Sequence, residues 1–395
     1  MHDNDGPGSG GLEIAGEAAW RNLVASKASR WTLAESDPDY GRSAHGRLAA
    51  GIALPHLTPK FTLSEDDAFF CIGSCFARHI EEHLVYRGIE VASKAIAFDG
   101  KLGRPNASVN KFTTGSILNE LRWSLADEPF PSGSLVEDEG GWRDLQLSPG
   151  SSALPLEQAR ARRNKVTAYF AGIRQATVVV ITLGLVEAWY DAETRVILNV
   201  APSLWMTRRH PGRFRLRVTG YGANLAALHA IYAVLARHAS PGLRIVVTVS
   251  PVPLSRTFTG QDAIVANTYA KSTLRAAAED SARAYPSVQY YPSYEAIAVS
   301  NRALTYSAVD DLHVRDEAVE AVTGHFLRTY GINRERPHPE FVELEYLFAN
   351  PDVHQAVLEQ QFVTGYAHWL AHGRAEGRPL RAEHRSPVVQ ALLGP

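Results

Sequence analysis

The feature that most constrains how this chain can fold is a series of short, unbroken apolar runs separated by segments with helical periodicity. The strongest run spans residues 177–183 (TVVVITL) and stops at Gly184. Weaker runs lie at 68–72, 89–91, 243–249 and 288–291. A strand that is covered on both faces lacks the apolar–polar alternation of a half-exposed strand. These runs therefore predict the buried strands of a parallel sheet.

The segments between the runs have the spacing of helices. After the first run, Phe76, Ile80 and Leu84 recur every four residues, and Gly88 then provides a C-terminal stop. Further helices are predicted at 157–175, at 223–239, at 263–284 and around Val319, Val322 and Phe326. Strands that alternate with helices form βαβ units, so we predict an α/β fold whose parallel sheet is covered on both faces.

Composition divides the chain into regions. Residues 1–54 are predicted to be an N-terminal arm, Gly-rich and disordered over 1–12, with Trp20, Trp31 and Tyr40 as candidates for holding the rest against the main body. Residues 55–332 form the main domain, in which 131–155 is predicted to be a loop or insertion. A polar linker at 331–340 leads to a small helical module at 341–380 and a tail at 381–395.

Charge and composition argue against several classes of protein. The 395 residues include 40 Lys and Arg against 42 Asp and Glu, and no long basic run occurs, so a nucleic-acid partner is not expected. The first residues lack the basic and apolar regions of a signal peptide, and no uncharged apolar run reaches the length of a membrane span. We therefore expect a cytoplasmic protein. Cys71 and Cys75 are the only cysteines, which excludes a disulfide framework and is too few for a zinc site.

Polar side chains follow several of the predicted strands. Ser74 and Cys75 follow the first, Thr182 and Glu187 lie around the end of the strongest, and Ser250 follows the next. Ligands of open α/β sheets bind at the carboxyl ends of the strands. A fourth polar cluster, Asp310-Asp311-Leu312-His313, lies in the loop before the closing helix. These four clusters are the candidates for a functional site.

Cys75 stands where a helix would begin. There the unpaired N–H groups can bind an oxyanion, and the positive end of the helix lowers the pKa of a thiol. His313 could take the thiol proton, and Asp310 could orient His313. A cysteine beside Phe and Ala is also common in ordinary core packing, which is the interpretation we give to Cys71. His79 and His83 lie four residues apart, but with no third ligand in view we favour a solvated helix face over a metal site.

Several segments resemble the GSCFA family. Residues 73–77 reproduce the five-residue signature that gives the family its name. Further similar segments are NKFTT at 110–114, TLGLVEAW at 182–189, SPVPL at 250–254 and DDLHV at 310–314. The resemblance covers roughly residues 55–330. The GSCFA family is grouped with the SGNH (GDSL-like) hydrolases, which implies a flavodoxin-like three-layer fold and esterase or acyltransferase chemistry, often on carbohydrates.

The resemblance implies roles for individual residues. The SGNH pattern ends in Asp-x-x-His, matched by Asp310 as orienter and His313 as base. Aligning Gly73-Ser74-Cys75 with the Gly-Asp-Ser turn makes Cys75 the nucleophile, and a slip of one residue would make it Ser74. The oxyanion Asn of the Gly-x-Asn-Asp block falls on Val186, so Asn110 is the replacement candidate. The oxyanion and substrate-binding candidates are Gly73, Asn110, Thr182, Gly184, Glu187, Trp189 and Ser250.

The expected function is therefore that of an SGNH-like esterase or O-acyltransferase acting on an acylated, most simply acetylated, carbohydrate. No metal or redox cofactor is implied, and a transferase would need an acyl donor such as an acyl thioester. The rival hypotheses are a non-catalytic carbohydrate- or protein-binding protein of the same fold, and an assembly role in which the C-terminal module docks a partner. Packing of that module onto the main domain is the simpler alternative.

Overall fold

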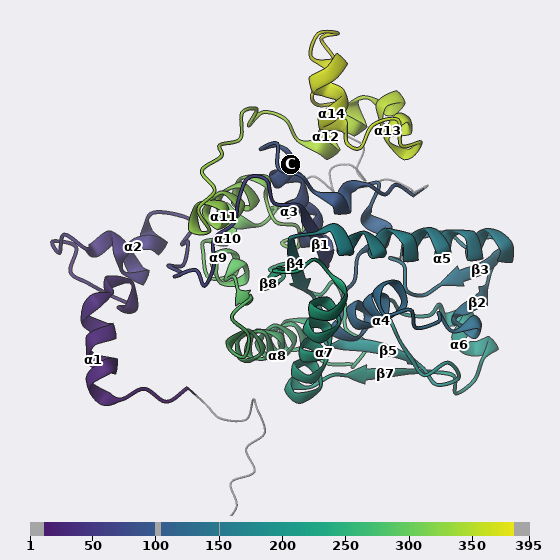
Figure 1. Cartoon of the computed structure of the whole chain (residues 1–395), viewed down its shortest axis with the longest axis horizontal. Coiled ribbons are helices and arrows are strands. Elements are labelled where there is room, and N and C mark those ends of the chain that lie inside the picture. Colours follow the sequence, from purple (N-terminus) through teal and green to yellow (C-terminus); the bar gives the residue numbers. More distant parts are fainter. Residues whose placement is uncertain (1–11, 99–103, 150, 383–395) are drawn as a thin grey trace, which may run out of the picture.

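The computed structural model describes residues 12–98, 104–149 and 151–382, and its centre is a four-stranded parallel sheet. The strands are β1 (Phe69–Gly73), β4 (Val178–Leu183), β8 (Arg244–Val249) and β9 (Val288–Tyr290), in the order β1-β4-β8-β9. Helices flank this sheet (Figure 1). The prediction of an α/β fold with a covered parallel sheet is confirmed.

The run at 89–91 does not form a full strand, so this part of the prediction is wrong. It pairs with the sheet through a single parallel bridge between Val91 and Phe69. The short 3-10 helix Ala92–Lys94 follows at once and turns the backbone away from the sheet. The bridge nevertheless lies beside β1. With it, the order of elements along the sheet is the 2-1-3-4-5 order of flavodoxin-like folds.

Alternate residues of β1 point to opposite faces, as a strand requires. Phe70 and Ile72 belong to a core with helices α4 (Thr114–Leu125), α5 (Leu156–Ala171), α7 (Tyr221–His238) and α8 (Ala263–Arg283). Phe69 and Cys71 belong to the opposite core, with α3 (Cys75–Val85) and α11 (Asp316–Thr329). These two cores make the molecule three-layered. The buried position of Cys71 confirms its interpretation as a packing residue.

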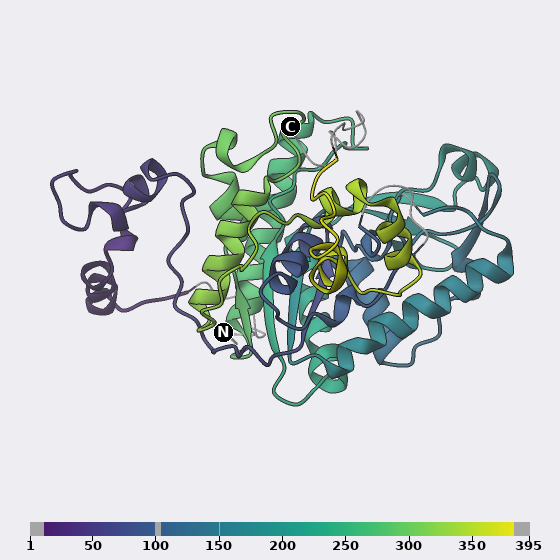
Figure 2. The same cartoon turned by 90° about the horizontal axis from the view of Figure 1, so that it is seen from above.

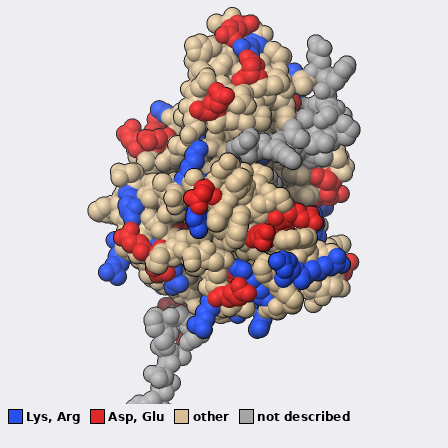
Figure 3. Space-filling view, turned by 90° about the vertical axis from the view of Figure 1, so that its right-hand side faces the viewer, with Lys and Arg blue, Asp and Glu red and all other residues tan. Residues whose placement is uncertain are grey.

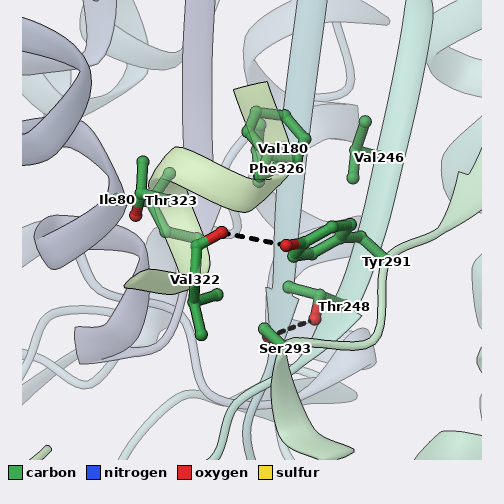
Figure 4. A pocket seen from close by; sticks show the side chains of 9 residues that line it. All are labelled: Ile80, Val180, Val246, Thr248, Tyr291, Ser293, Val322, Thr323 and Phe326. Carbon is green, nitrogen blue, oxygen red and sulfur yellow. Dashed lines mark hydrogen bonds between the residues drawn. The ribbon is translucent and has the colours of Figure 1, made fainter. Parts of the chain in front are cut away.

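The packing of α11 on the sheet is close. Figure 4 shows Tyr291, just after β9, donating a 2.9 Å hydrogen bond to the carbonyl oxygen of Val322 on α11, and Thr248 bonded to Ser293. The gap that these side chains enclose has a volume of about 10 Å³. Such a gap has room for about one water molecule. It is part of the core packing rather than a ligand site.

Two smaller sheets were missed by the sequence analysis. The predicted loop at 131–155 contains an antiparallel hairpin of β2 (Leu135–Asp138) and β3 (Gly141–Asp144). After β4 comes an antiparallel sheet in the order β6-β5-β7, made of β5 (Glu187–Asp191), β6 (Val196–Leu198) and β7 (Phe214–Val218). These strands are short and only partly buried, so they lack long apolar runs. They share a small core with α6 (Leu204–Arg209).

The N-terminal region differs from the prediction. Among the residues described it forms α1 (Gly16–Ala25) and α2 (Ala44–Ala49), which stand beside the main body in Figure 2, while residues 1–11 lie outside the described part. Trp20 is 70% exposed and Trp31 is 67% exposed. The idea that these two tryptophans hold the arm against the main body is therefore wrong.

The C-terminal region packs on the main body near α3. It contains α12 (Glu343–Ala349), α13 (Pro351–Leu358) and α14 (Gly365–His368), and a π-helical turn follows at Trp369–Gly373. Its core of Phe341, Tyr346, Tyr366 and Trp369 includes Tyr86 from the end of α3. The remaining helices, α9 (Ser293–Ala298) and α10 (Arg302–Thr305), precede the loop that carries Asp310 and His313.

Within the described ranges, no helix is both long and apolar enough to cross a membrane. Figure 3 shows the face of the molecule at the right-hand side of Figure 1, where basic and acidic side chains are interspersed. This distribution agrees with the near balance of 40 basic and 42 acidic residues in the sequence.

Candidate functional site

The turn between β1 and α3 has a backbone that depends on glycine. Gly73 has a φ of 139°, and a Cβ there would lie 2.1 Å from the carbonyl oxygen of Thr182. The amide of Ser74 donates to that same oxygen at 3.1 Å. Ser74 is the N-cap residue of α3, and its hydroxyl lies 3.3 Å from Oγ1 of Thr182. The turn is thus fixed against β4, with Cys75 as the first helical residue.

Cys75 lies at a partly exposed position, in contrast to Cys71. Burial raises the pKa of the Cys75 thiol above its ordinary value, while the charges of Arg104 and Lys271 and the N–H groups of Cys75 and Phe76 act to lower this pKa. These N–H groups belong to the first turn of a helix, where they have no partner within the helix. An anion on the sulfur would therefore be stabilised by these N–H groups and by the two cations, against the cost of burial.

A cavity of about 480 Å³ lies at the carboxyl ends of β1, β4 and β8. Seven of the predicted site residues line it: Ser74, Cys75, Gly184, Glu187, Trp189, Ser250 and His313. Because the strands are parallel, their following loops meet at one edge, which is the physical basis of the prediction. The cavity wall is otherwise mainly apolar, with Phe112, Leu185 and Val252 among its residues.

His313 and Asp310 form a hydrogen-bonded pair. Nδ1 of His313 lies 2.5 Å from Oδ2 of Asp310, and Oδ1 of Asp310 accepts the backbone amides of Leu312 at 3.0 Å and His313 at 3.1 Å. Burial acts to raise the pKa of the Asp310 carboxyl, but these hydrogen bonds outweigh it and hold the pKa below its ordinary value. Nε2 of His313 has no hydrogen bond to any described residue. Asp310 thus orients the ring through Nδ1, and Nε2 remains available for a hydrogen bond or a proton transfer.

The remaining four predicted residues, Gly73, Asn110, Thr182 and Asp310, do not line the cavity. Thr182 is fully buried behind Ser74 and supports the turn. Asn110 is close to the turn along the backbone, because the amide of the next residue, Lys111, donates to the carbonyl of Gly73 at 2.7 Å. Oδ1 of Asn110 is buried and has no hydrogen-bond partner in the described part of the chain. Its side-chain amide is therefore not committed to holding the fold.

Glu187 and Trp189 reach the cavity from β5, on the small sheet that the sequence analysis missed. The Glu187 carboxylate accepts the hydroxyl of Thr257 at 2.5 Å and the amide of Phe258 at 2.9 Å. The rings of Trp189 and Phe258 meet edge to face, 5.3 Å apart. Nε1 of Trp189 is buried and finds no partner among the described residues. The indole N–H could thus donate to a ligand.

Sequence reasoning missed Phe112, Asn199, Arg256 and Phe258, which line the cavity, and Lys271, which lies behind its wall. One signal for Lys271 was present. It shares the buried face of α8 with Leu274, Ala278 and Ser281, at the spacings of a helical stripe. A lysine on such a stripe is unusual, because lysine is almost never fully buried without a partner. The other four follow no local pattern that would have identified them.

The interpretation of His79 and His83 as a solvated helix face is wrong. His83 is fully buried and bonded at both ring nitrogens, to Glu320 at 2.8 Å and to Asp316 at 3.0 Å. His79 is partly buried beside Arg104. The described residues contain no group of three or more His, Cys, Asp or Glu side chains placed to hold a metal ion.

The fold and the cavity define an α/β protein of flavodoxin-like strand order, with its candidate site at the carboxyl edge of the sheet. The chain belongs to the GSCFA family, whose model matches residues 68–326. This span begins just before β1 and ends within α11, so it contains every predicted site residue. A comparison with curated proteins gave no match.

Proposed function

We propose that this protein is an SGNH-like esterase or O-acyltransferase with Cys75 as nucleophile, His313 as base and Asp310 as orienter. The observation that carries the proposal is that His313 lines the same cavity as Ser74 and Cys75, from which it is distant in the sequence, and that His313 keeps one ring nitrogen unbonded to any described residue. A nucleophile, a base and a residue that orients the base are the parts that covalent acyl transfer requires.

The reaction would run in two steps. His313 takes the thiol proton as the Cys75 sulfur attacks the acyl carbon, and the C–O bond to the alcohol then breaks as His313 returns that proton to the leaving oxygen. In the second step, His313 deprotonates either water or an acceptor hydroxyl. That oxygen attacks the thioester, and the sulfur leaves with the proton. Water gives hydrolysis, and a sugar hydroxyl gives transfer.

The oxyanion of each tetrahedral intermediate needs hydrogen-bond donors. The N–H groups of Cys75 and Phe76 are at the start of α3 and already act on the sulfur. The Asn110 amide is proposed as the third donor: Asn110 does not line the cavity, but it lies close to the turn, its Oδ1 has no partner among the described residues, and rotation of the amide exchanges oxygen and nitrogen. The loop that carries it is anchored at the next residue, because Lys111 is fully buried and bonded to Glu120 at 2.6 Å.

An acylated carbohydrate is the proposed substrate class. The Trp189 indole supplies an apolar face with a buried N–H that no described residue accepts, and the nearby Glu187 carboxylate can accept hydroxyl groups. No cofactor is proposed. An acyl thioester would be the donor in the transferase version, which fits a cytoplasmic location.

The second candidate function is ligand binding without catalysis. Three observations favour it. Burial raises the pKa of Cys75, and no hydrogen bond among the described residues joins the His313 ring to Cys75 or Ser74. In addition, Val186 stands at the position of the oxyanion Asn of the SGNH pattern.

The test is turnover of p-nitrophenyl acetate and of an acetyl thioester with an acceptor sugar, in the wild type and in three variants. We expect Cys75→Ala and His313→Ala to lose roughly 1,000-fold in kcat/KM, and Ser74→Ala to lose far less. Loss confined to Ser74→Ala would identify Ser74 as the nucleophile. Full activity of His313→Ala would overturn the triad, and no turnover of any ester by a folded wild type would favour the binding protein.

A further inference from the structure

Lys271 is a buried cation that the proposed mechanism does not use. It is 1% exposed, on the face of α8 that packs against the sheet. Its Nζ donates to the carbonyl oxygens of Gly184 at 3.0 Å and Val252 at 2.8 Å. In the described part of the chain it has no carboxylate partner. A buried charge without a counter-ion is costly, so its retention needs an explanation.

The two carbonyl groups place Lys271 directly behind the candidate nucleophile. Gly184 and Val252 follow β4 and β8, and both line the 480 Å³ cavity together with Cys75. Gly184 lies against the nucleophile turn, because a Cβ on it would be 3.2 Å from the Cβ of Ser74. The ammonium group is thus separated from the Ser74–Cys75 turn by about one layer of backbone.

We propose that Lys271 is a positioning residue whose ammonium group stabilises negative charge on the Cys75 sulfur and holds the Gly184 and Val252 loops in place around it. A role of Lys271 in catalysis rests on the proposed function, but its effect on the ionisation of the Cys75 thiol can be measured without turnover. Two N–H groups of Lys271 are used by the carbonyls. The third N–H of the ammonium group is the one that a neutral amine lacks.

The charges around the two groups agree with this assignment. Burial lowers the pKa of Lys271 to about 7, and the charge of Cys75 opposes this shift. A negative sulfur and a protonated Lys271 therefore favour each other, and the ammonium group acts on the thiol below about pH 7, where Lys271 carries its proton. Arg104 is the other main cation that acts on Cys75, but its guanidinium is already paired with Glu82 through two hydrogen bonds of 2.6 and 2.9 Å. Of the two cations, Lys271 is the one without a carboxylate partner among the described residues.

The test measures the rate of alkylation of Cys75 by iodoacetamide from pH 6 to 10.5, with the modified peptide identified by mass spectrometry. Lys271→Gln removes the charge and keeps an NH₂ group for the two carbonyls. At pH 6, where Lys271 of the wild type carries its proton, we expect alkylation of this variant to be about tenfold slower, which corresponds to one pKa unit of the thiol. Lys271→Arg keeps the charge, so its rate at pH 6 should stay within about threefold of the wild type.

The matched control is Lys60→Met. Nζ of Lys60 also donates to backbone carbonyls, those of Ala282, Tyr285 and Val288, but Lys60 does not line the cavity. This variant should lose stability and leave the Cys75 profile unchanged. A folded Lys271→Gln protein with the wild-type alkylation rate at pH 6 would overturn the proposal, because a purely structural lysine does not change the ionisation of the thiol.

A second variant covers the case in which Lys271→Gln does not fold. Lys271→Arg keeps its charge across the whole pH range, whereas the wild-type lysine loses its proton near pH 7. We expect Cys75 of Lys271→Arg to be alkylated about tenfold faster than Cys75 of the wild type at pH 8.5. Equal rates at this pH would contradict the proposal. Neither measurement uses an ester substrate, so failure here is distinct from failure of the proposed function.

Discussion

Two histidine–carboxylate groups in this molecule have the same chemistry and opposite surroundings. His313 is bonded to Asp310 through Nδ1 alone, and its side chain is 36% exposed at the wall of the cavity. His83 is buried between α3 and α11, with Nδ1 on Glu320 and Nε2 on Asp316. One ring therefore has a nitrogen available for proton transfer, and the other has both nitrogens committed.

The surroundings of the second group are those of a structural network. Glu320 also accepts a hydrogen bond from Arg87 at the end of α3, and Asp316 accepts one of 3.0 Å from Arg336 in the segment before the C-terminal helices. The network thus joins α3, α11 and the C-terminal region. Proximity of an acid to a histidine does not indicate a function by itself. What differs is whether a ring nitrogen is left without a protein partner beside a cavity.

The largest expected effect separates the two histidines by activity. His313→Gln should lower kcat/KM for an activated ester by roughly 1,000-fold, because the base is lost, and should leave the unfolding free energy nearly unchanged. His83→Gln should retain wild-type kcat/KM per folded molecule. Active-site titration with a thiol-reactive ester measures the folded fraction. A His83→Gln protein that folds but lacks turnover would break the comparison.

The next effect is on stability, and here His83 is expected to matter more than His313. His83→Gln removes the fully buried ring that joins Asp316 and Glu320, whose side chains are each 33% exposed, so we expect a loss of about 2 kcal/mol in the free energy of unfolding. Urea denaturation followed by tryptophan fluorescence gives this value. His313→Gln serves as the matched control on the exposed pair. Equal losses in the two variants would show that the exposed pair also holds the fold.

The smallest effect is the dependence of stability on pH. Burial acts to lower the pKa of His83, but the bonds to Asp316 and Glu320 outweigh it and hold the pKa above its ordinary value. A raised folded-state pKa stabilises fully below the unfolded value of about 6.5, and this contribution disappears as the pH rises through the folded value. The stability difference between wild type and His83→Gln should therefore shrink from pH 6 to pH 9.

Urea midpoints at each pH, converted to free energies, measure this difference. Subtracting the variant from the wild type removes contributions that the two proteins share, including that of His325, whose pKa burial lowers to about 4. A difference that stays constant across this range would mean that His83 does not change its charge there.

Part of the site could be predicted from the sequence because its signals are local. Gly73, Ser74 and Cys75 follow an apolar run and precede a helical stripe, so their place at the edge of a sheet was predictable. Glu187 and Trp189 were identified as candidates, but the strand that carries them was not predicted. The pairing partners of β5 are themselves short and half-exposed, and partner choice of this kind depends on residues distant in sequence.

The sequence by itself determined the class of fold and the turn that carries the candidate nucleophile, since buried strands, amphipathic helices and a glycine-dependent turn leave patterns within a few neighbouring residues. It placed His313 and Asp310 together because they lie three residues apart. Only the tertiary structure decided that His313 faces the same cavity as Cys75, that His83 is buried between two carboxylates, and that Lys271 lies behind the turn. Burial and the number of partners of a polar group come from segments that meet only after the chain has folded, and these decide whether a side chain can react or serves to hold the fold.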